Sequence, residues 1–210
     1  MDLTIVRHSI SSDNGRGLIS GAGSDVDLSE AGIELAQEAQ RAFDWNQFDQ
    51  VFSSPMRRAK QTAELLLGDQ ASAINFDKRL TEMNFGDWDG TAEDAIFEQY
   101  PEIFNQMGMF NEKYSDYAPN SESYDELVNR VTGFLDELKQ KYPTASILLI
   151  CHGMTTRALF AALLHVSPAQ FGKIGNVTLN QIYLDETNHF EPRIDLYNQK
   201  LKNGLKPPTS

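Results

Sequence analysis

The fold is decided by the stretch Leu3-Thr4-Ile5-Val6-Arg7-His8, which occupies residues 3–8. Residues 3–6 have the composition of a short β-strand, and the basic pair Arg7 and His8 follows the strand directly. The same arrangement occurs at residues 146–152, where His152 follows an apolar strand pattern. Because ligands bind outside the carboxyl ends of the strands in an open α/β sheet, we expect both histidines at one binding rim.

Strand patterns alternate with helical patterns along most of the chain. The strand patterns occupy residues 3–6, 50–53, 73–76, 146–151 and 179–184. One helical pattern begins at Ser29 and continues with apolar residues at four-residue spacing to Phe43. Another begins at Ser54 and Pro55 and runs to Gly68. We expect both helices to lie against the sheet.

The clearest helix of the sequence begins at Ser123. The spacing from Ser123 to Glu126 matches a capping box, in which each residue satisfies a backbone N–H group of the other. An apolar stripe at helical spacing then continues to Leu138, and basic residues and Pro143 follow it. The pattern predicts a long amphipathic helix before the strand at residues 146–151.

Strands that alternate with amphipathic helices predict right-handed βαβ units. The expected fold class is therefore α/β, a three-layer α/β/α sandwich with a mostly parallel central sheet and a helical insertion over the site. We expect residues 1–200 to form a single domain. Residues 91–121, rich in aromatic residues, Met, Asn and acids, interrupt the alternation and are interpreted as a lid insertion. Residues 201–210 are interpreted as a flexible tail.

The composition is that of one globular domain, with 210 residues, 40% hydrophobic and 23% charged. The chain has 18 Lys and Arg against 30 Asp and Glu, and its net charge of −12 repels nucleic acid and anionic membranes. Its apolar segments are too short to span a bilayer, and the single cysteine, Cys151, cannot form an internal disulfide. We therefore expect a cytoplasmic protein without nucleic-acid or membrane partners. The oligomeric state stays open, a homodimer included.

The residues at the predicted strand ends are suited to phosphate chemistry. Arg7 adjoins His8, and Arg57 and Arg58 follow the strand at residues 50–53. Planar guanidinium groups match phosphate oxygens and stabilise the charge that develops during phosphoryl transfer, and an imidazole can act as the nucleophile. This combination predicts phosphoryl transfer without a metal ion.

Several short motifs occur in an order that is typical of one known family. They are Ile5-Val6-Arg7-His8-Ser9 followed by Asn14, Asp27-Leu28-Ser29, Ser53-Ser54-Pro55-Met56-Arg57-Arg58-Ala59, Leu80-Thr81-Glu82, and Cys151-His152-Gly153. With these motifs the chain resembles the histidine phosphatase superfamily, in its phosphoglycerate-mutase-like branch, over residues 3–164. Any one motif alone would be weak support, because an Arg-His pair often arises by chance.

The resemblance implies a phosphoric monoester hydrolase of the histidine acid phosphatase type that needs no cofactor. His8 would attack phosphorus and form a phosphohistidine, which water would then hydrolyse. Glu82 would give a proton to the leaving oxygen, a role that requires a carboxyl whose pKa is raised by partial burial. The substrate class implied is a small phosphorylated metabolite, held as a phosphomonoester.

The resemblance also assigns the remaining residues of the expected site. His152 joins His8 and Glu82 in the catalytic group. The expected phosphate-binding residues are Arg7, Asn14, Arg58 and Gly153. Of the two adjacent arginines, Arg58 matches the family position, because it directly precedes Ala59, and Arg57 is expected to be exposed.

The first motif departs from the family pattern. The family usually has Arg-His-Gly-Glu-Thr, whereas this chain has Ser9, Ile10 and Ser11 after the Arg-His pair. A glycine at the position of Ser9 allows close approach of the backbone to phosphate. We expect Ser9 either to shift the loop or to add a hydroxyl contact, and we expect activity to survive because the charged positions are filled.

Two alternatives to the phosphatase stay open from the sequence, a cofactor-dependent phosphoglycerate mutase and a noncatalytic phosphate-binding module. Residues 91–126 contain nine acids and the single basic residue Lys113. If these acids surround the leaving group, they favour one that is neutral, aromatic or cationic. Four other conspicuous residues are interpreted as structural: Trp88, Cys151, His165 and His189.

Overall fold

The computed structural model describes residues 1–201, and within them a six-stranded sheet in the order β3-β2-β4-β1-β5-β6 forms the centre of the molecule. The strands are β1 (Asp2–Arg7), β2 (Gln50–Ser53), β3 (Ile74–Phe76), β4 (Ser146–Cys151), β5 (Thr178–Asp185) and β6 (Glu191–Lys200). β1 to β4 are parallel, and β5 and β6 add an antiparallel hairpin beside β1. The prediction of a mostly parallel sheet is therefore confirmed.

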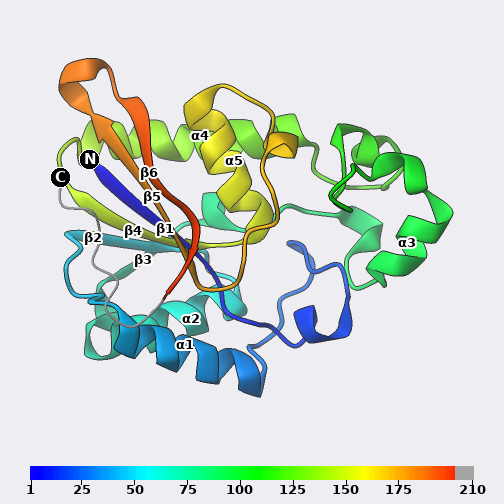
Figure 1. Cartoon of the computed structure of the whole chain (residues 1–210), viewed down its shortest axis with the longest axis horizontal. Helices are drawn as coiled ribbons and strands as arrows, with labels where there is room; N and C mark the ends of the chain where they lie inside the picture. Colours follow the sequence, from blue (N-terminus) through cyan, green and yellow to red (C-terminus); the bar gives the residue numbers. More distant parts are fainter. Residues whose placement is uncertain (202–210) are drawn as a thin grey trace.

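Helices cover both faces of the sheet, as Figure 1 shows. They are α1 (Glu30–Ala42), α2 (Arg57–Leu67), α3 (Glu93–Gln99), α4 (Tyr124–Lys141) and α5 (Gly153–Leu164). α1 and α2 lie on one face, and α4 and α5 lie on the other (Figure 1). This arrangement confirms the expected three-layer α/β/α class.

The sheet divides the hydrophobic core into two clusters because successive side chains of a strand point to opposite faces. Leu149 of β4 packs with α4 and α5, whereas its neighbours Leu148 and Ile150 pack with α1 and α2. Residues 147–151 are all fully buried. An apolar run without alternation is what a central parallel strand needs, because both of its faces are covered.

The helix that was expected from Ser123 is α4. The Ser123 hydroxyl accepts a hydrogen bond from the backbone N–H of Glu126, and the Glu126 side chain accepts one from the backbone N–H of Ser123. The predicted capping box is therefore confirmed. Leu127, Val131 and Leu138 form part of the buried face of the helix.

α2 begins at Arg57, later than the predicted start at Ser54 and Pro55. The later start is explained by contacts with residues that are distant in the sequence. A carboxylate oxygen of Asp25, from the loop after β1, accepts the backbone N–H of Arg57 at 2.7 Å, and the Ser54 hydroxyl contacts His152 at 2.8 Å instead of capping the helix. Arg57 is exposed, as predicted.

β6 was not predicted. Its residues are mostly half-buried or exposed, so the strand lacks a clear apolar alternation. It also contains Pro192, which is tolerated because β6 lies at the edge of the sheet. Of the tail that was predicted at residues 201–210, residues 202–210 lie outside the described part of the chain.

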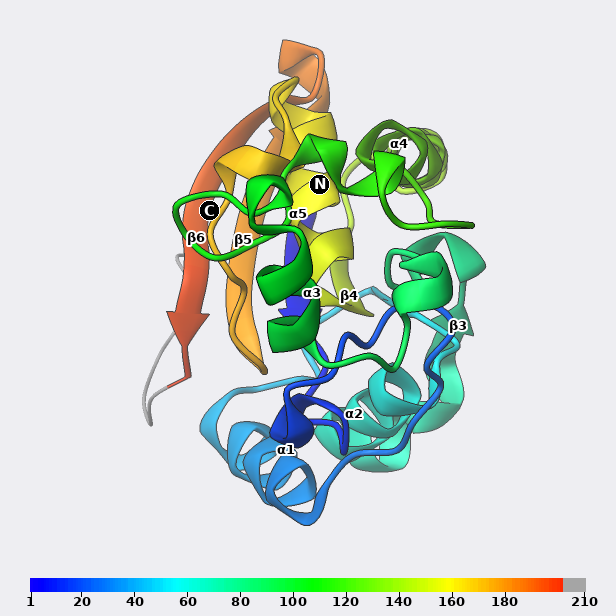
Figure 2. The ribbon, with the colours of Figure 1, turned by 90° about the vertical axis from the view of Figure 1, so that its right-hand side faces the viewer.

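Residues 91–121 contain α3 and short 3₁₀ turns at Pro101–Ile103 and Glu112–Asp116. Figure 2 shows this segment in front of the ends of β4 and β5. An aromatic cluster joins it to the domain, with Trp88 stacked on Tyr100 at 5.7 Å between ring centroids. Within residues 1–201, no helix is both long and apolar enough to cross a membrane.

Loss of the capping box should weaken α4 measurably. We expect Ser123→Ala to lower the free energy of unfolding by about 1 kcal/mol, because the backbone N–H of Glu126 loses its acceptor. Ser123→Asn retains an acceptor oxygen and should stay within about 0.5 kcal/mol of wild type. Urea unfolding of the three proteins tests this, and equal losses for both variants would contradict it.

Candidate active site

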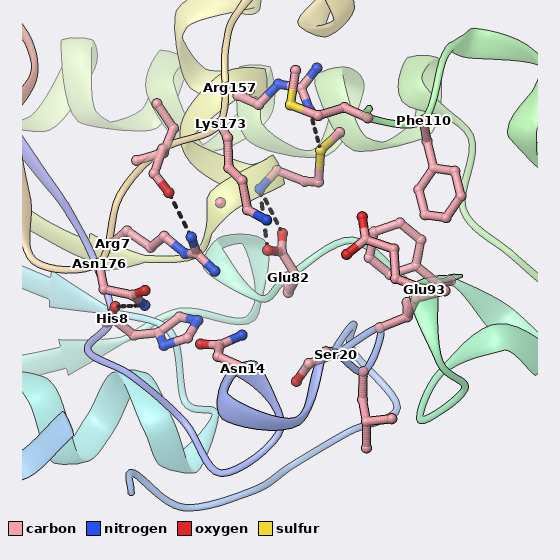
Figure 3. Close-up of a pocket in the computed structure, with 18 residues that line it drawn as sticks. Arg7, His8, Asn14, Ser20, Glu82, Glu93, Phe110, Arg157, Lys173 and Asn176 are labelled. Atoms are coloured by element: carbon pink, nitrogen blue, oxygen red, sulfur yellow. Dashed lines mark hydrogen bonds between the residues drawn. The ribbon is translucent and has the colours of Figure 1, made fainter. Parts of the chain in front are cut away.

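A cavity of about 310 Å³ lies beyond the carboxyl ends of β1 and β4. Its walls bring together five residues that were expected in the site, Arg7, His8, Asn14, Glu82 and Gly153. Figure 3 shows how the labelled side chains among its lining residues point into the cavity. The volume lies at the lower end of the range for small-molecule sites, so the cavity suits a small ligand.

His8 has one ring nitrogen available for chemistry. Its Nδ1 lies 2.6 Å from the carbonyl oxygen of Ser9, and a carbonyl oxygen can only accept a hydrogen bond. Nδ1 therefore carries the hydrogen, and the lone pair of the neutral ring lies on Nε2. Asn176 donates from Nδ2 to the His8 carbonyl at 2.8 Å and steadies the backbone at this point. The tautomer is thus fixed, and Nε2 is the ring nitrogen that is chemically able to act as a nucleophile.

Burial keeps both histidines of the site neutral. His8 is 2% exposed and His152 is fully buried, with 5.0 Å between the ring centroids. Desolvation, followed by the positive charges of Arg7 and Arg58, lowers the pKa of His8 well below its usual value. Desolvation, followed by the charge of Arg58, does the same to the pKa of His152. At neutral pH the lone pair of His8 is therefore not blocked by a proton.

Arg7 and Gly153 form the wall next to His8. The guanidinium of Arg7 is anchored by Nη1, which donates to the carbonyl of Ile174 at 2.6 Å. Its Nε is buried and has no hydrogen-bond partner among the described residues. A Cβ added to Gly153 would lie 3.5 Å from Nε of Arg7 and 3.7 Å from Oε2 of Glu82. The absence of a side chain at Gly153 thus leaves space next to the Arg7 donor, where an anion can bind, and keeps the Glu82 carboxyl group open to the cavity.

Glu82 is held by the amino-terminal end of α5. Its Oε1 accepts hydrogen bonds from the backbone N–H groups of Met83, Met154 and Thr155, at 2.9, 3.1 and 3.1 Å. Two of these donors belong to the first turn of α5, where the N–H groups lack partners within the helix. The carboxylate is 6% exposed and lines the cavity. Its position is therefore rigid.

The structure places Arg58 and His152 behind the cavity wall rather than among its lining residues. Arg58 is fully buried and donates to the backbone carbonyls of Ser20, Gly21 and Ser24, in the loop after β1. Both residues still lie close enough to His8 to act on it, Arg58 through its charge and His152 through ring contact.

The Ser9 hydroxyl does not face the cavity. It donates to the carbonyl of Gly32 at 2.7 Å, and the backbone N–H of Ser9 donates to the Thr62 hydroxyl at 2.9 Å. Ser9 is fully buried. Of the two alternatives stated for Ser9, the hydroxyl contact with a bound phosphate is therefore not supported, because the hydroxyl connects the loop after β1 to α1.

The charges around the cavity also differ from the expectation. Of the acids in residues 91–126, all of them within the described part of the chain, Glu93 alone lines the cavity. Arg157 and Lys173 line it as well. The condition under which these acids would favour a neutral, aromatic or cationic leaving group is therefore met only by Glu93, since the other acids of residues 91–126 do not line the cavity.

Sequence reasoning did not single out five lining residues whose polar side chains can interact with a ligand. They are Ser20, Glu93, Arg157, Lys173 and Asn176. None belongs to a recognised motif, and only the fold brings their loops and helices together. Among residues 1–201, no three His, Cys, Asp or Glu side chains are grouped closely enough to hold a metal ion.

Cys151 and Trp88 have the structural roles that were predicted. Cys151 is fully buried, and desolvation raises the pKa of its thiol to about 12. Trp88 is 7% exposed and packs against Tyr100 and Phe110. A thiol that stays protonated at neutral pH is not a nucleophile.

Comparison with known proteins places the chain among phosphate-transferring enzymes. The sequence profile of the histidine phosphatase superfamily (branch 1) matches residues 3–200. Phosphoserine phosphatase 1 of Hydrogenobacter thermophilus is 29% identical over 186 residues, which cover 88% of this chain and 87% of that protein. The 2,3-bisphosphoglycerate-dependent phosphoglycerate mutase of Cytophaga hutchinsonii is 28% identical over 180 residues, 84% of this chain and 83% of that protein.

A solved structure extends the similarity to the whole fold. The structure named mycobacterial hydrolase 1 superimposes with a TM-score of 0.82 at 26% identity, covering 94% of this chain and 98% of that one. The sheet order and the helices on both faces are thus shared with a known enzyme fold.

The neutral histidines should make stability depend on pH. Their pKa values are lowered in the folded protein, so the unfolded chain binds more protons below its own histidine pKa of about 6.5. Stability is therefore lost as the pH falls through this value. Between pH 6.5 and 5.5 we expect a loss of about 1 kcal/mol for each histidine.

Urea unfolding in phosphate-free buffer at the two pH values measures this loss. His8→Asn should remove about half of it, whereas His165→Asn, at an exposed position, should leave it unchanged. A wild-type protein with equal stability at both pH values would contradict the neutral histidines.

A methyl group at Gly153 should block the anion position. We expect Gly153→Ala to fold normally, because the new Cβ meets its neighbours at ordinary contact distances, and to bind inorganic phosphate about tenfold to a hundredfold more weakly. Gly133→Ala, on the open surface of α4, is the matched control and should bind like wild type. Calorimetric titration measures both, and unchanged affinity in Gly153→Ala would place the anion elsewhere.

Proposed function

The chain belongs to the histidine phosphatase superfamily, and on that basis we propose that it hydrolyses a small phosphomonoester through a phosphohistidine intermediate. The observation that carries the proposal is the state of His8. Its Nδ1 hydrogen is committed to the Ser9 carbonyl, its lowered pKa keeps Nε2 unprotonated, and the ring lines a cavity that also holds Arg7 and Glu82. The relative from Hydrogenobacter thermophilus, named a phosphatase, supports the same reaction.

In the first step Nε2 of His8 attacks phosphorus, and the bond between phosphorus and the leaving oxygen breaks. Arg7, Asn14 and the open backbone at Gly153 hold the nonbridging oxygens, and the guanidinium stabilises their charge. Arg58 adds positive charge from behind His8, and His152 packs against the reacting ring. Glu82 gives its proton to the leaving oxygen, so the alcohol departs neutral.

In the second step water attacks the phosphohistidine. Glu82, now ionised, accepts a proton from this water, and the N–H groups at the start of α5 stabilise its charge. The bond between phosphorus and Nε2 breaks, and phosphate leaves.

Phosphoglycerate mutase is the second candidate, because Arg157 and Lys173 line the cavity and can attract a carboxylate. A mutase relative from Cytophaga hutchinsonii has similar coverage of the chain. A mutase moves phosphate between two positions of phosphoglycerate, whereas a phosphatase releases it. The two are separated by the product that forms from 3-phosphoglycerate.

We also propose that residues 91–121 act as a lid within a single domain of residues 1–200. Glu93, Met109 and Phe110 of this segment line the cavity, which supports the assignment. A cytoplasmic location agrees with the buried thiol of Cys151, and the net charge of −12 favours a small-molecule partner over nucleic acid or membrane. A homodimer remains open.

Removal of the nucleophile should abolish the activity. In the presence of EDTA we expect wild type to release phosphate from p-nitrophenyl phosphate and His8→Ala to lose at least about a thousandfold of kcat/KM. His165→Asn should keep full activity, because His165 lies in the exposed cap of α5, outside the cavity.

A phosphohistidine hydrolyses in acid, so the reaction is quenched at alkaline pH and the enzyme is then digested. A mass increase of one phosphoryl group on the peptide that contains His8 is the expected result. If the protein binds phosphate but neither hydrolyses the ester nor forms a phosphoenzyme, a noncatalytic binding module is favoured. Loss of activity in EDTA would contradict the metal-independent route.

A further inference from the structure

The segment that carries Glu82 lies between two cavities. The Glu82 carboxylate faces the cavity of the candidate active site, as Figure 3 shows. Glu82 also lines a second cavity, of about 410 Å³, together with its neighbours Thr81 and Asn84. The two cavities remove packing neighbours from this segment, so hydrogen bonds must contribute more to its position.

Arg130, on α4, holds the backbone that precedes Glu82. Its Nη1 donates hydrogen bonds to the carbonyl oxygens of Arg79 and Thr81, at 2.8 and 3.1 Å. The Thr81 carbonyl also accepts a hydrogen bond from the hydroxyl of Thr155, at 2.6 Å. A guanidinium is suited to this role, because its planar fork offers donors in several fixed directions at once.

Glu122, which precedes α4, holds the backbone that follows Glu82. Its Oε2 accepts a hydrogen bond from the backbone N–H of Asn84 at 3.2 Å, and its own backbone N–H donates to the Asn84 carbonyl at 2.8 Å. The carboxylate also accepts Nε and Nη2 of Arg130, one on each oxygen, both at 2.9 Å. The side chains of this ion pair are 21% and 15% exposed, so solvent screens it only in part.

On the basis of the proposed hydrolysis, we propose that the ion pair of Arg130 and Glu122 positions Glu82 for proton transfer to the leaving oxygen. The N–H groups of α5 hold the carboxylate, and the ion pair holds the backbone from which this side chain extends. Neither Arg130 nor Glu122 lines the cavity that contains His8, so both are positioning residues. A misplacement of about 1 Å can lower a catalysed rate about a hundredfold, which makes this support consequential.

Leaving groups of different acidity distinguish a positioning role from a purely structural one. p-Nitrophenolate is a stable anion that departs without a proton, whereas phenolate is a stronger base and departs more easily when an acid protonates it. The two aryl phosphates are otherwise alike. An ion pair that only stabilises the fold would change kcat/KM for both by the same factor, whereas loss of proton transfer from Glu82 affects mainly phenyl phosphate.

Removal of the guanidinium should therefore reduce one activity selectively. We expect Arg130→Gln to lower kcat/KM about tenfold or more for phenyl phosphate and less than about threefold for p-nitrophenyl phosphate. Glu122→Gln, which keeps one acceptor oxygen, should show the same selectivity with a smaller loss. Circular dichroism checks that each variant is folded, and Glu122→Gln carries the same test if Arg130→Gln does not fold.

Arg79→Gln is the matched control. The Arg79 side chain joins the same segment to α4, through Glu137 at 2.7 Å, and its other hydrogen bonds are to Asp77 and the Gly133 carbonyl. It therefore makes no hydrogen bond to residues 81–84. We expect this variant to change kcat/KM for both esters by the same factor, within about twofold of wild type.

A double-mutant cycle tests whether the ion pair acts through Glu82. Glu82→Gln alone should lower kcat/KM selectively for phenyl phosphate. In this background Arg130→Gln should change kcat/KM for phenyl phosphate by less than about twofold, because the proton donor is already absent. A further tenfold loss would mean that Arg130 acts on another group, and it would overturn the positioning role.

The outcomes separate the two proposals. No hydrolysis of p-nitrophenyl phosphate by wild type would overturn the proposed function, and the positioning role with it. An equal loss for both esters in Glu82→Gln would overturn proton transfer by Glu82, and again the positioning role. A selective loss in Glu82→Gln together with an equal loss for both esters in Arg130→Gln would overturn the positioning role alone.

Discussion

The hydrogen bond from Nδ1 of His8 to the carbonyl of Ser9 is the contact on which the proposed chemistry depends. It determines the tautomer, and so it decides which nitrogen can attack. Its geometry depends on a backbone that three other elements hold, through Asn176 on the His8 carbonyl, Thr62 on the Ser9 N–H, and Gly32 on the Ser9 hydroxyl. Close packing of α1 is part of this support, since a Cβ on Gly32 would lie 2.0 Å from the Ile10 carbonyl oxygen. The local geometry of His8 and Ser9 thus depends on residues that are distant in the sequence.

Charge is arranged locally in a way that the whole chain does not suggest. The protein has a net charge of −12, yet Arg7, Arg58, Arg157 and Lys173 surround or approach one cavity. Desolvation and the charges of Arg7 and Arg58 lower the pKa of His8 and keep it neutral, while the amino-terminal N–H groups of α5 hold the carboxylate of Glu82. An anionic substrate would be repelled over most of the surface and attracted at this opening.

The fold and most of the residues grouped around His8 could be predicted from the sequence because they depend on local patterns. Apolar runs identified β1 and β4, and the residues that follow each run had to lie at the same rim. The capping box of Ser123 could be predicted equally well, since its two residues are only three positions apart. β6 could not be recognised, because an edge strand needs no apolar face and tolerates Pro192.

The sequence by itself determined the fold class and the family, and it identified His8, Arg7 and Glu82 as candidate site residues, because each is encoded in a short segment with its own periodicity or motif. Only the tertiary structure decided which further charges line the cavity. Glu93, Arg157 and Lys173 come from segments that are far apart in the chain, and nine acids in one region did not reveal that one of them enters the cavity. Side-chain direction at such positions is set by packing between elements, and packing leaves no local signature in the sequence.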